Sequence, residues 1–159
     1  MRKRKINPQY LRHITSQDVK DEKIDSLDFA LSIKRFADDY LRGIMQVVIS
    51  GTPRGTVSIK LPVASYLIRL LAECADNDDL VELDITLGDK LTIRADYNSA
   101  CKSEDVAAVV KVAKLAGFEV ARDGNSLFFS AKAVTSSVLQ VYANSGEDFL
   151  NLLITTHKM

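Results

Sequence analysis

The stretch that most constrains the fold runs from Ser103 to Val134 and reads SEDVAAVVKVAKLAGFEVARDGNSLFFSAKAV. Ser103 precedes two acidic residues, which is typical of the first turn of a helix, and apolar residues then recur at helical spacing. Gly117 follows this stripe, at the place where a left-handed residue commonly ends a helix. Apolar residues alternate on both sides of Asp123-Gly124, which predicts a β-hairpin. A helix with one apolar face and two strands directly after it needs a sheet to pack on.

The residues before this stretch predict more of the same sheet. Residues 56–61 alternate as a strand, and residues 63–75 are apolar enough for a buried helix. Residues 81–95 alternate again on both sides of a Gly88-Asp89 turn, which predicts a second hairpin. These segments favour a sheet in which most neighbouring strands are antiparallel.

The two ends of the chain complete the prediction. We expect residues 1–25 to be a polar, flexible segment, and residues 26–159 to form a single domain. Within it we expect an N-terminal helix over 26–48 and a C-terminal helical segment over 137–156. The resulting order is α-β-α-β-β-α-β-β-α. It predicts an α/β (α+β) fold, a two-layer sandwich with a mostly antiparallel sheet and helices on one face.

Charge and cysteine content bear on the function classes. The 21 basic and 21 acidic residues cancel, so the chain as a whole does not attract nucleic acid or an anionic membrane. Two cysteines and two distant histidines do not match a zinc spacing or a disulfide framework. Every apolar run is shorter than the twenty or so residues that span a bilayer. We therefore expect a cytoplasmic protein with no membrane segment.

The expected helix over 26–48 carries more apolar residues than one helical stripe needs. Apolar side chains recur from Leu27 to Ile44 on more than one side of the helix. A helix of this kind is buried on two sides or contacts a second chain. We therefore expect a homodimer or a protein partner at this helix.

Two short motifs and the closing hairpin carry a resemblance to a known family. Residues 70–74 (LLAEC) and 91–98 (LTIRADYN), together with the helix and hairpin of 103–134, resemble segments of histidine-kinase ATP-binding domains, the GHKL or Bergerat fold. The resemblance covers about residues 56–134, and a ferredoxin-like strand order remains the alternative. It implies a nucleotide site for Mg-ATP or Mg-ADP at Glu73, Asp96 and Asn98.

The sequence also departs from that family. Glu73 stands where the family has the asparagine that binds magnesium, although a carboxylate also offers the oxygen ligands that magnesium prefers. Residues 98–103 contain no glycine, whereas backbone amides approach a phosphate most closely where glycines permit it. The resemblance therefore implies a degenerate member, more suited to regulation or protein interaction than to catalysis.

One histidine offers a third hypothesis. Residues 10–14 (YLRHI) are similar to the segment around the phosphoacceptor of histidine kinases, which implies phosphotransfer through His13. Three functions thus remain open after the sequence: a non-catalytic regulatory or protein-interaction domain, which we favour, an adenine-nucleotide-binding module, and a histidine phosphotransfer protein.

Overall fold

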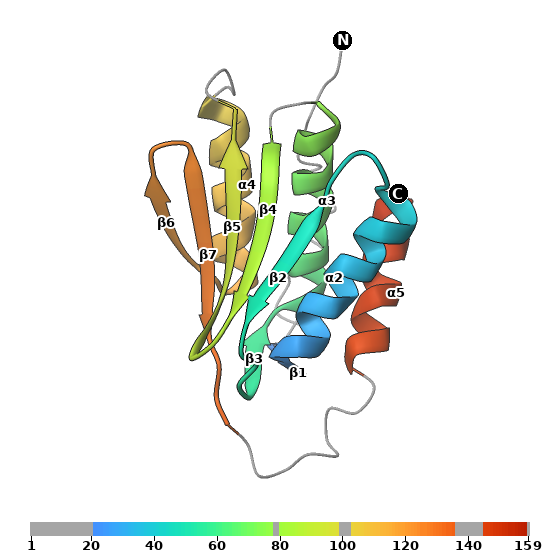
Figure 1. Ribbon diagram of the computed structural model, residues 1–159, viewed down its shortest axis with the longest axis vertical. Helices are drawn as coiled ribbons and strands as arrows, with labels where there is room; N and C mark the ends of the chain where they lie inside the picture. Colours follow the sequence, from blue (N-terminus) through green and yellow to red (C-terminus); the bar gives the residue numbers. More distant parts are fainter. Residues whose placement is uncertain (1–20, 78–79, 99–102, 136–144, 159) are drawn as a thin grey trace.

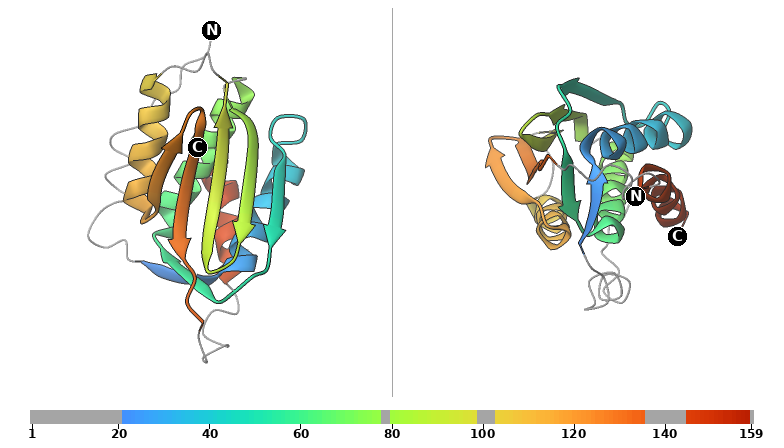
Figure 2. Two further views of the ribbon diagram at one scale, coloured as in Figure 1. Left: turned by 60° about the vertical axis from the view of Figure 1, so that its left-hand side comes forward. Right: turned by 90° about the horizontal axis from the view of Figure 1, so that it is seen from below.

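The computed structural model describes residues 21–77, 80–98, 103–135 and 145–158. They form a five-stranded sheet with four helices packed on one of its faces, as Figures 1 and 2 show. The predicted α/β sandwich with a mostly antiparallel sheet is therefore confirmed. In chain order, the elements are β1 (Glu22–Asp25), α2 (Ser26–Tyr40), β2 (Val47–Gly51), β3 (Thr56–Ile59), α3 (Leu61–Asp76), β4 (Leu80–Leu87), β5 (Lys90–Tyr97), α4 (Ser103–Ala116), β6 (Glu119–Asp123), β7 (Ser126–Lys132) and α5 (Ser145–His157).

The large sheet has the strand order β2-β4-β5-β7-β6. Its strands pair antiparallel except for β2, which lies parallel to β4 at one edge. A separate antiparallel pair, β1 and β3, lies beside it, and an isolated bridge between Thr56 and Val134 joins the two sheets. The edges of the large sheet are therefore β2 and β6.

The helix α3 occupies the middle of the core. Twelve of its 16 residues are buried, which is the environment expected of a helix that is apolar nearly all round. Pro62 lies in its first turn, where a missing backbone N–H costs no hydrogen bond. The predicted buried helix is confirmed. It lies against the inner face of the sheet, on which the other helices are also arranged.

The helix and hairpin from Ser103 to Val134 form as predicted. α4 ends at Ala116, and Gly117 follows with a φ of 111°, a conformation that glycine adopts without steric cost. Gly124 has a φ of 60° in the turn between β6 and β7, as a tight hairpin requires. This part of the fold is therefore determined locally.

The expected helix over 26–48 is too long. α2 ends at Tyr40, and Val47–Gly51 is the edge strand β2. Its N-cap is Asp25 rather than Ser26: the Asp25 carboxylate accepts hydrogen bonds from the amides of Leu27 and Asp28, both at 3.1 Å. Two strands, β1 and β2, were thus missed, and β1 lies within the segment expected to be flexible.

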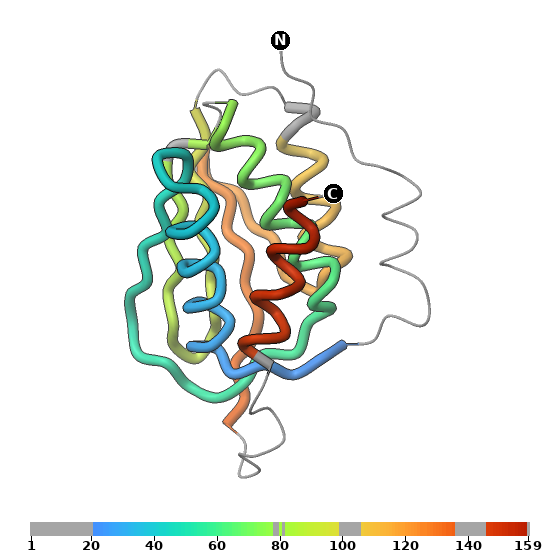
Figure 3. Tube along the Cα trace, turned by 90° about the vertical axis from the view of Figure 1, so that its right-hand side faces the viewer, coloured from blue at the N-terminus to red at the C-terminus, as the bar shows by residue number. Residues whose placement is uncertain are grey.

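The wide apolar face of α2 is used inside the molecule. α5 packs along α2 and α3, as Figure 3 shows, with the rings of Phe29 and Phe149 stacked at 4.8 Å between centroids. Near the other end of the two helices, His157 meets the ring of Phe36 edge-on at 5.4 Å. The first part of the predicted segment 137–156 lies outside the described residues, and the helix is described from Ser145. Among the described residues, no helix is both long and apolar enough to cross a membrane.

Candidate functional site

Asp96, one of the predicted nucleotide-binding residues, lies on the face of β5 that points away from the helices. Its neighbours Ala95 and Tyr97 are buried against the core, so alternation along the strand turns Asp96 to the outer face. Arg94 Nε donates to both of its carboxylate oxygens, at 3.0 and 3.1 Å, and the Ser126 hydroxyl donates to Oδ1. The hydrogen bond from Arg94 is the main cause that holds the pKa of Asp96 below its usual value.

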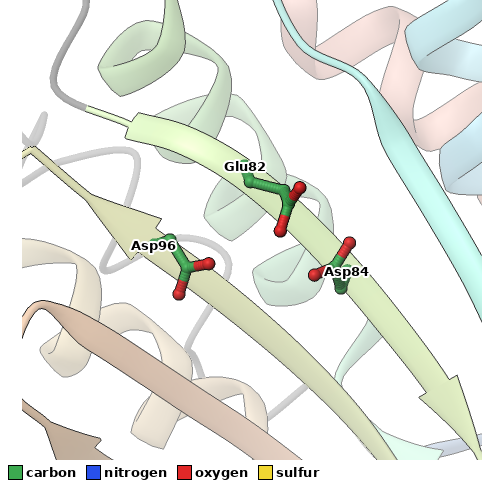
Figure 4. A group of neighbouring side chains, drawn as sticks. All are labelled: Glu82, Asp84 and Asp96. Atoms are coloured by element: carbon green, nitrogen blue, oxygen red, sulfur yellow. The ribbon is translucent and has the colours of Figure 1, made fainter.

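Two more carboxylates face the same guanidinium. Figure 4 shows Glu82 and Asp84 on β4 beside Asp96 on β5, and the carboxylate oxygens of the three lie within 4.8 Å of one another. Arg94 Nη2 lies 3.6 Å from Glu82 Oε2 and 3.9 Å from Asp84 Oδ2. The hydrogen bond and the charge of Asp84 raise the pKa of Glu82, and the charge and hydrogen bond of Asp96 raise that of Arg94. We call these four residues the outer-face cluster.

The outer-face cluster could bind a divalent cation only at the expense of Arg94. Three carboxylates are the oxygen ligands that magnesium and calcium prefer, but the guanidinium already lies among them and supplies the positive charge. The simplest chemical role of the cluster is an ion-pair network that ties β4 to β5. Sequence reasoning missed three of its members, although alternation in both strands around Gly88-Asp89 places them on one face.

Glu73 lies on the other side of the sheet. It is on α3, where its Oε1 lies 3.4 Å from Arg69 Nε, and Arg69 Nη1 donates to the carbonyl of Thr156 on α5 at 3.1 Å. Together with His157 it lines a small cavity of about 150 Å³. The structure therefore does not bring Glu73 and Asp96 to a common pocket.

The remaining predicted residues contribute less. Asn98 is exposed directly after the end of β5, next to residues 99–102, which the structure does not describe. His13, the predicted phosphoacceptor, lies outside the described residues. The roles assigned to Glu73, Asp96, Asn98 and His13 stay predictions.

Part of the range 26–48 stays exposed, on α2 itself, where Leu31 is 47% exposed, and toward the edge of the sheet. Large apolar side chains that remain exposed between the end of α2 and β2 are Tyr40, Ile44 and Val48, at 39%, 41% and 43%. All three lie in the range 26–48 that was predicted to contact a partner. They lie close in sequence to β2, the strand at this edge of the sheet.

The backbone of β2 is open along its outer side. The Thr52 N–H donates to the carbonyl of Leu87 on β4 at 3.1 Å, so in this parallel pairing Val47, Ile49 and Gly51 direct their backbone groups away from β4. Lys34 Nζ lies 3.5 Å from the carbonyl oxygen of Val47. No described residue hydrogen-bonds to the outward backbone groups of Ile49 or Gly51. They form a short row of donors and acceptors available to another strand.

The two edges of the sheet differ in their chemistry. β2 reads VVISG and has no charged residue or proline, whereas β6 reads EVARD and has three charged residues. Charges on an edge strand are a common device against pairing with another chain. β6 is therefore protected in this way and β2 is not.

Comparisons with known proteins find similar structures only at low sequence identity. No protein-family model matches the sequence, and no curated protein matches it. The cytoplasmic segment of histidine kinase QseC has a similar structure, with a TM-score of 0.47 and 16% identity over 84% of this chain and 99% of that one. Histidine kinase AdeS from Acinetobacter baumannii gives 0.48 and 14%, over 82% and 77% of the two chains. The ATP-binding domain of PrrB from Mycobacterium tuberculosis gives 0.43 and 16%, over 74% and 99%. The chain resembles histidine-kinase ATP-binding domains in structure, at low sequence identity.

Proposed function

We propose that this chain is a non-catalytic protein-interaction domain that pairs with a second copy of itself along β2. The observation that carries the proposal is the backbone edge of that strand, which has no charged residue of its own and is open at Ile49 and Gly51, next to the exposed side chain of Val48. Natural sheets rarely leave such an edge without charge, proline or a covering element. A strand from another chain would satisfy the outward backbone groups of Ile49 and Gly51.

The pattern of the outward backbone groups is suited to a two-fold dimer, in which the Val47 carbonyl would exchange its contact with Lys34 for an amide of the other chain. The outward residues Val47, Ile49 and Gly51 are spaced symmetrically about Ile49. In an antiparallel pair centred there, Ile49 faces its own copy and Val47 faces Gly51 of the other chain, so donors meet acceptors at each position. Self-complementary contacts of this kind are the usual basis of homodimers.

The side chains around the edge add apolar area. Val48 points to the outer face of the sheet and is 43% exposed, whereas Tyr40 and Ile44, also exposed, lie on the helix side toward His157 of α5. Exposed apolar side chains beside a free strand edge typically mark an interaction site. A regulatory role would follow if pairing through β2 controls which other surfaces are accessible.

The test is a charge placed on each edge in turn. Val48→Lys puts a lysine on the exposed face of β2, and Ala121→Lys puts one on the exposed face of β6 as a matched control. In sedimentation velocity, we expect the unmodified protein and Ala121→Lys to dimerise with concentration, and Val48→Lys to stay monomeric at the same concentrations. Circular dichroism spectra must agree among the three proteins.

Two results would overturn the proposal. One is an unmodified protein that is still a monomer near about 1 mM, where the dimerisation free energy would be weaker than about 4 kcal/mol. The other is a dimer that Val48→Lys does not weaken. If a different protein is found to occupy β2 in a monomeric chain, the interaction function holds but the second copy is the wrong partner.

A further inference from the structure

A cleft of about 560 Å³ lies at the junction of the two sheets. β6 pairs with β7 as far as Ser130, and further along β7 the Thr56–Val134 bridge joins it to β3. Between these two contacts, Lys132 lines the cleft on one side and Ser58 of β3 lines it on the other. The cleft is thus a place where two strands separate within an otherwise paired region.

The separation leaves one hydrogen-bonded position of the ladder unfilled. Thr56 and Val134 exchange both backbone bonds, at 2.9 and 2.8 Å. In an antiparallel ladder the next such pair lies two residues further along each strand, which here is Ser58 with Lys132. No described residue takes the place of either partner on this side of the two strands.

Neighbouring hydrogen bonds show that both backbones point into the cleft. The Ala133 N–H donates to the carbonyl of Asp89, on the β5 side, at 2.9 Å, so Lys132, one residue earlier, faces the opposite side. The N–H of Lys60, two residues after Ser58, donates to the carbonyl of Ala116 at 2.9 Å. Ser58 therefore lies between two fixed contacts and cannot simply close the gap.

The side chains around the open position are polar and on balance positive. Lys23 and Lys132 line the cleft together with Glu119, the hydroxyls of Ser58 and Ser130 line it as well, and the acidic and basic groups sum to a net charge of +1. Lys132 also lies directly opposite Lys90 on β5. Like charges at this separation repel each other, and no described carboxylate pairs with either of these two lysines.

We infer that this cleft binds a small organic anion of metabolite size that carries a carboxylate or phosphate group. The N–H groups of Ser58 and Lys132, the Lys132 ammonium and the Ser130 hydroxyl supply donors for the anionic group, and the carbonyls of Ser58 and Lys132, which face the cleft too, accept from a hydroxyl or amino group of the same molecule. The volume lies within the range of about 300–1,000 Å³ that small-molecule sites occupy. The site is distinct from the dimer surface proposed above, because no residue of β2 lines the cleft.

The binding test uses inorganic phosphate, citrate and glutamate as probes, with sodium chloride at the same ionic strength as the reference. In ¹⁵N-¹H correlation spectra of the full chain, we expect at least one probe to shift the amides of Ser58 and Lys132 in a saturable way. Lys132→Gln should weaken that binding by about tenfold, as expected for one charge-assisted hydrogen bond. Lys111→Gln, at an exposed position on α4, is the matched control and should leave it unchanged.

A second variant tests the place of binding by volume. Ser58→Tyr introduces a ring at an exposed position that lines the cleft, and it should abolish binding while the remaining amide signals keep their positions. The inference is overturned if chloride reproduces the shifts, if the shifted amides lie away from the cleft, or if Lys132→Gln and Lys111→Gln weaken binding equally.

Discussion

Gly55 provides the most direct test of how the two sheets are joined. It has a φ of 68°, and its carbonyl accepts hydrogen bonds from both the amide and the hydroxyl of Ser26, each at 3.1 Å. A Cβ added to Gly55 would lie 2.2 Å from the carbonyl oxygen of Val134 and 2.7 Å from the amide nitrogen of Thr135. Gly55→Ala must therefore move backbone atoms at the bridge between β3 and β7.

The expected cost follows from two separate contributions. A non-glycine residue in the left-handed region costs about 1 kcal/mol or somewhat more. The clash additionally requires the Thr56–Val134 bridge to open, and its two backbone hydrogen bonds contribute about 1 kcal/mol each. We expect Gly55→Ala to lower the free energy of unfolding by about 3 to 4 kcal/mol, or roughly 10 °C in Tm for a chain of this size.

Gly124→Ala is the matched control for this experiment. Its φ of 60° is close to that of Gly55, but a Cβ there meets no atom within 4 Å, so only the conformational cost of about 1 kcal/mol applies. Urea denaturation of both variants measures the difference. If Gly55→Ala costs no more than Gly124→Ala, the contact between Gly55 and Val134 does not hold the sheets together and the reasoning fails.

Three further predictions concern single contacts. Asp25→Ala should lower the free energy of unfolding by about 1 kcal/mol in urea denaturation, because it removes the N-cap of α2, and Asp25→Asn should cost less. The pKa of Asp96 is depressed in the folded chain, so its stabilising effect is present above about pH 4 and is lost as the pH falls through the folded pKa; Asp96→Asn should flatten this acid limb, and an unchanged limb would refute it. The hydroxyls of Ser65 and Thr156 are buried and lie 3.0 Å apart, so a double-mutant cycle of Ser65→Ala and Thr156→Val should give a coupling energy of about 1 kcal/mol, and additive effects would contradict the bond.

Local signals account for the parts of the fold that were predicted from the sequence. The turn at Gly124 and the helix end at Gly117 depend on residues within a few positions, and both have the positive φ that glycine permits. The β4–β5 hairpin likewise depends on the alternation around its own turn. Such elements can be read from the sequence because their partners are close in the chain.

The strand β2 was missed because its partner is distant. The expected helix over 26–48 includes Val47 and Val48, the first two residues of β2, although three consecutive β-branched residues from Val47 favour a strand. Val47–Gly51 is a strand because it pairs in parallel with β4, more than thirty residues away. The neighbouring residues alone therefore do not distinguish a strand here from a longer helix. The range 26–48, for which a partner contact is predicted, thus holds both a helix and the edge strand of a sheet.

The candidate nucleotide residues show the same limit of local reasoning. The resemblance of residues 91–98 implies a nucleotide contact at Asp96, but the alternation of β5 decides which face this residue occupies, and Ala95 and Tyr97 hold the positions that face the helices. The resemblance of residues 70–74 implies the role of Glu73, whose carboxylate lies beside Arg69, and Arg69 in turn donates to Thr156 of α5. A ligand that needs both carboxylates would have to reach around the sheet. The two proposed sites do not have this difficulty. The outward backbone groups of β2 all lie along one edge of the sheet, and the groups proposed to bind an anion all line one cleft.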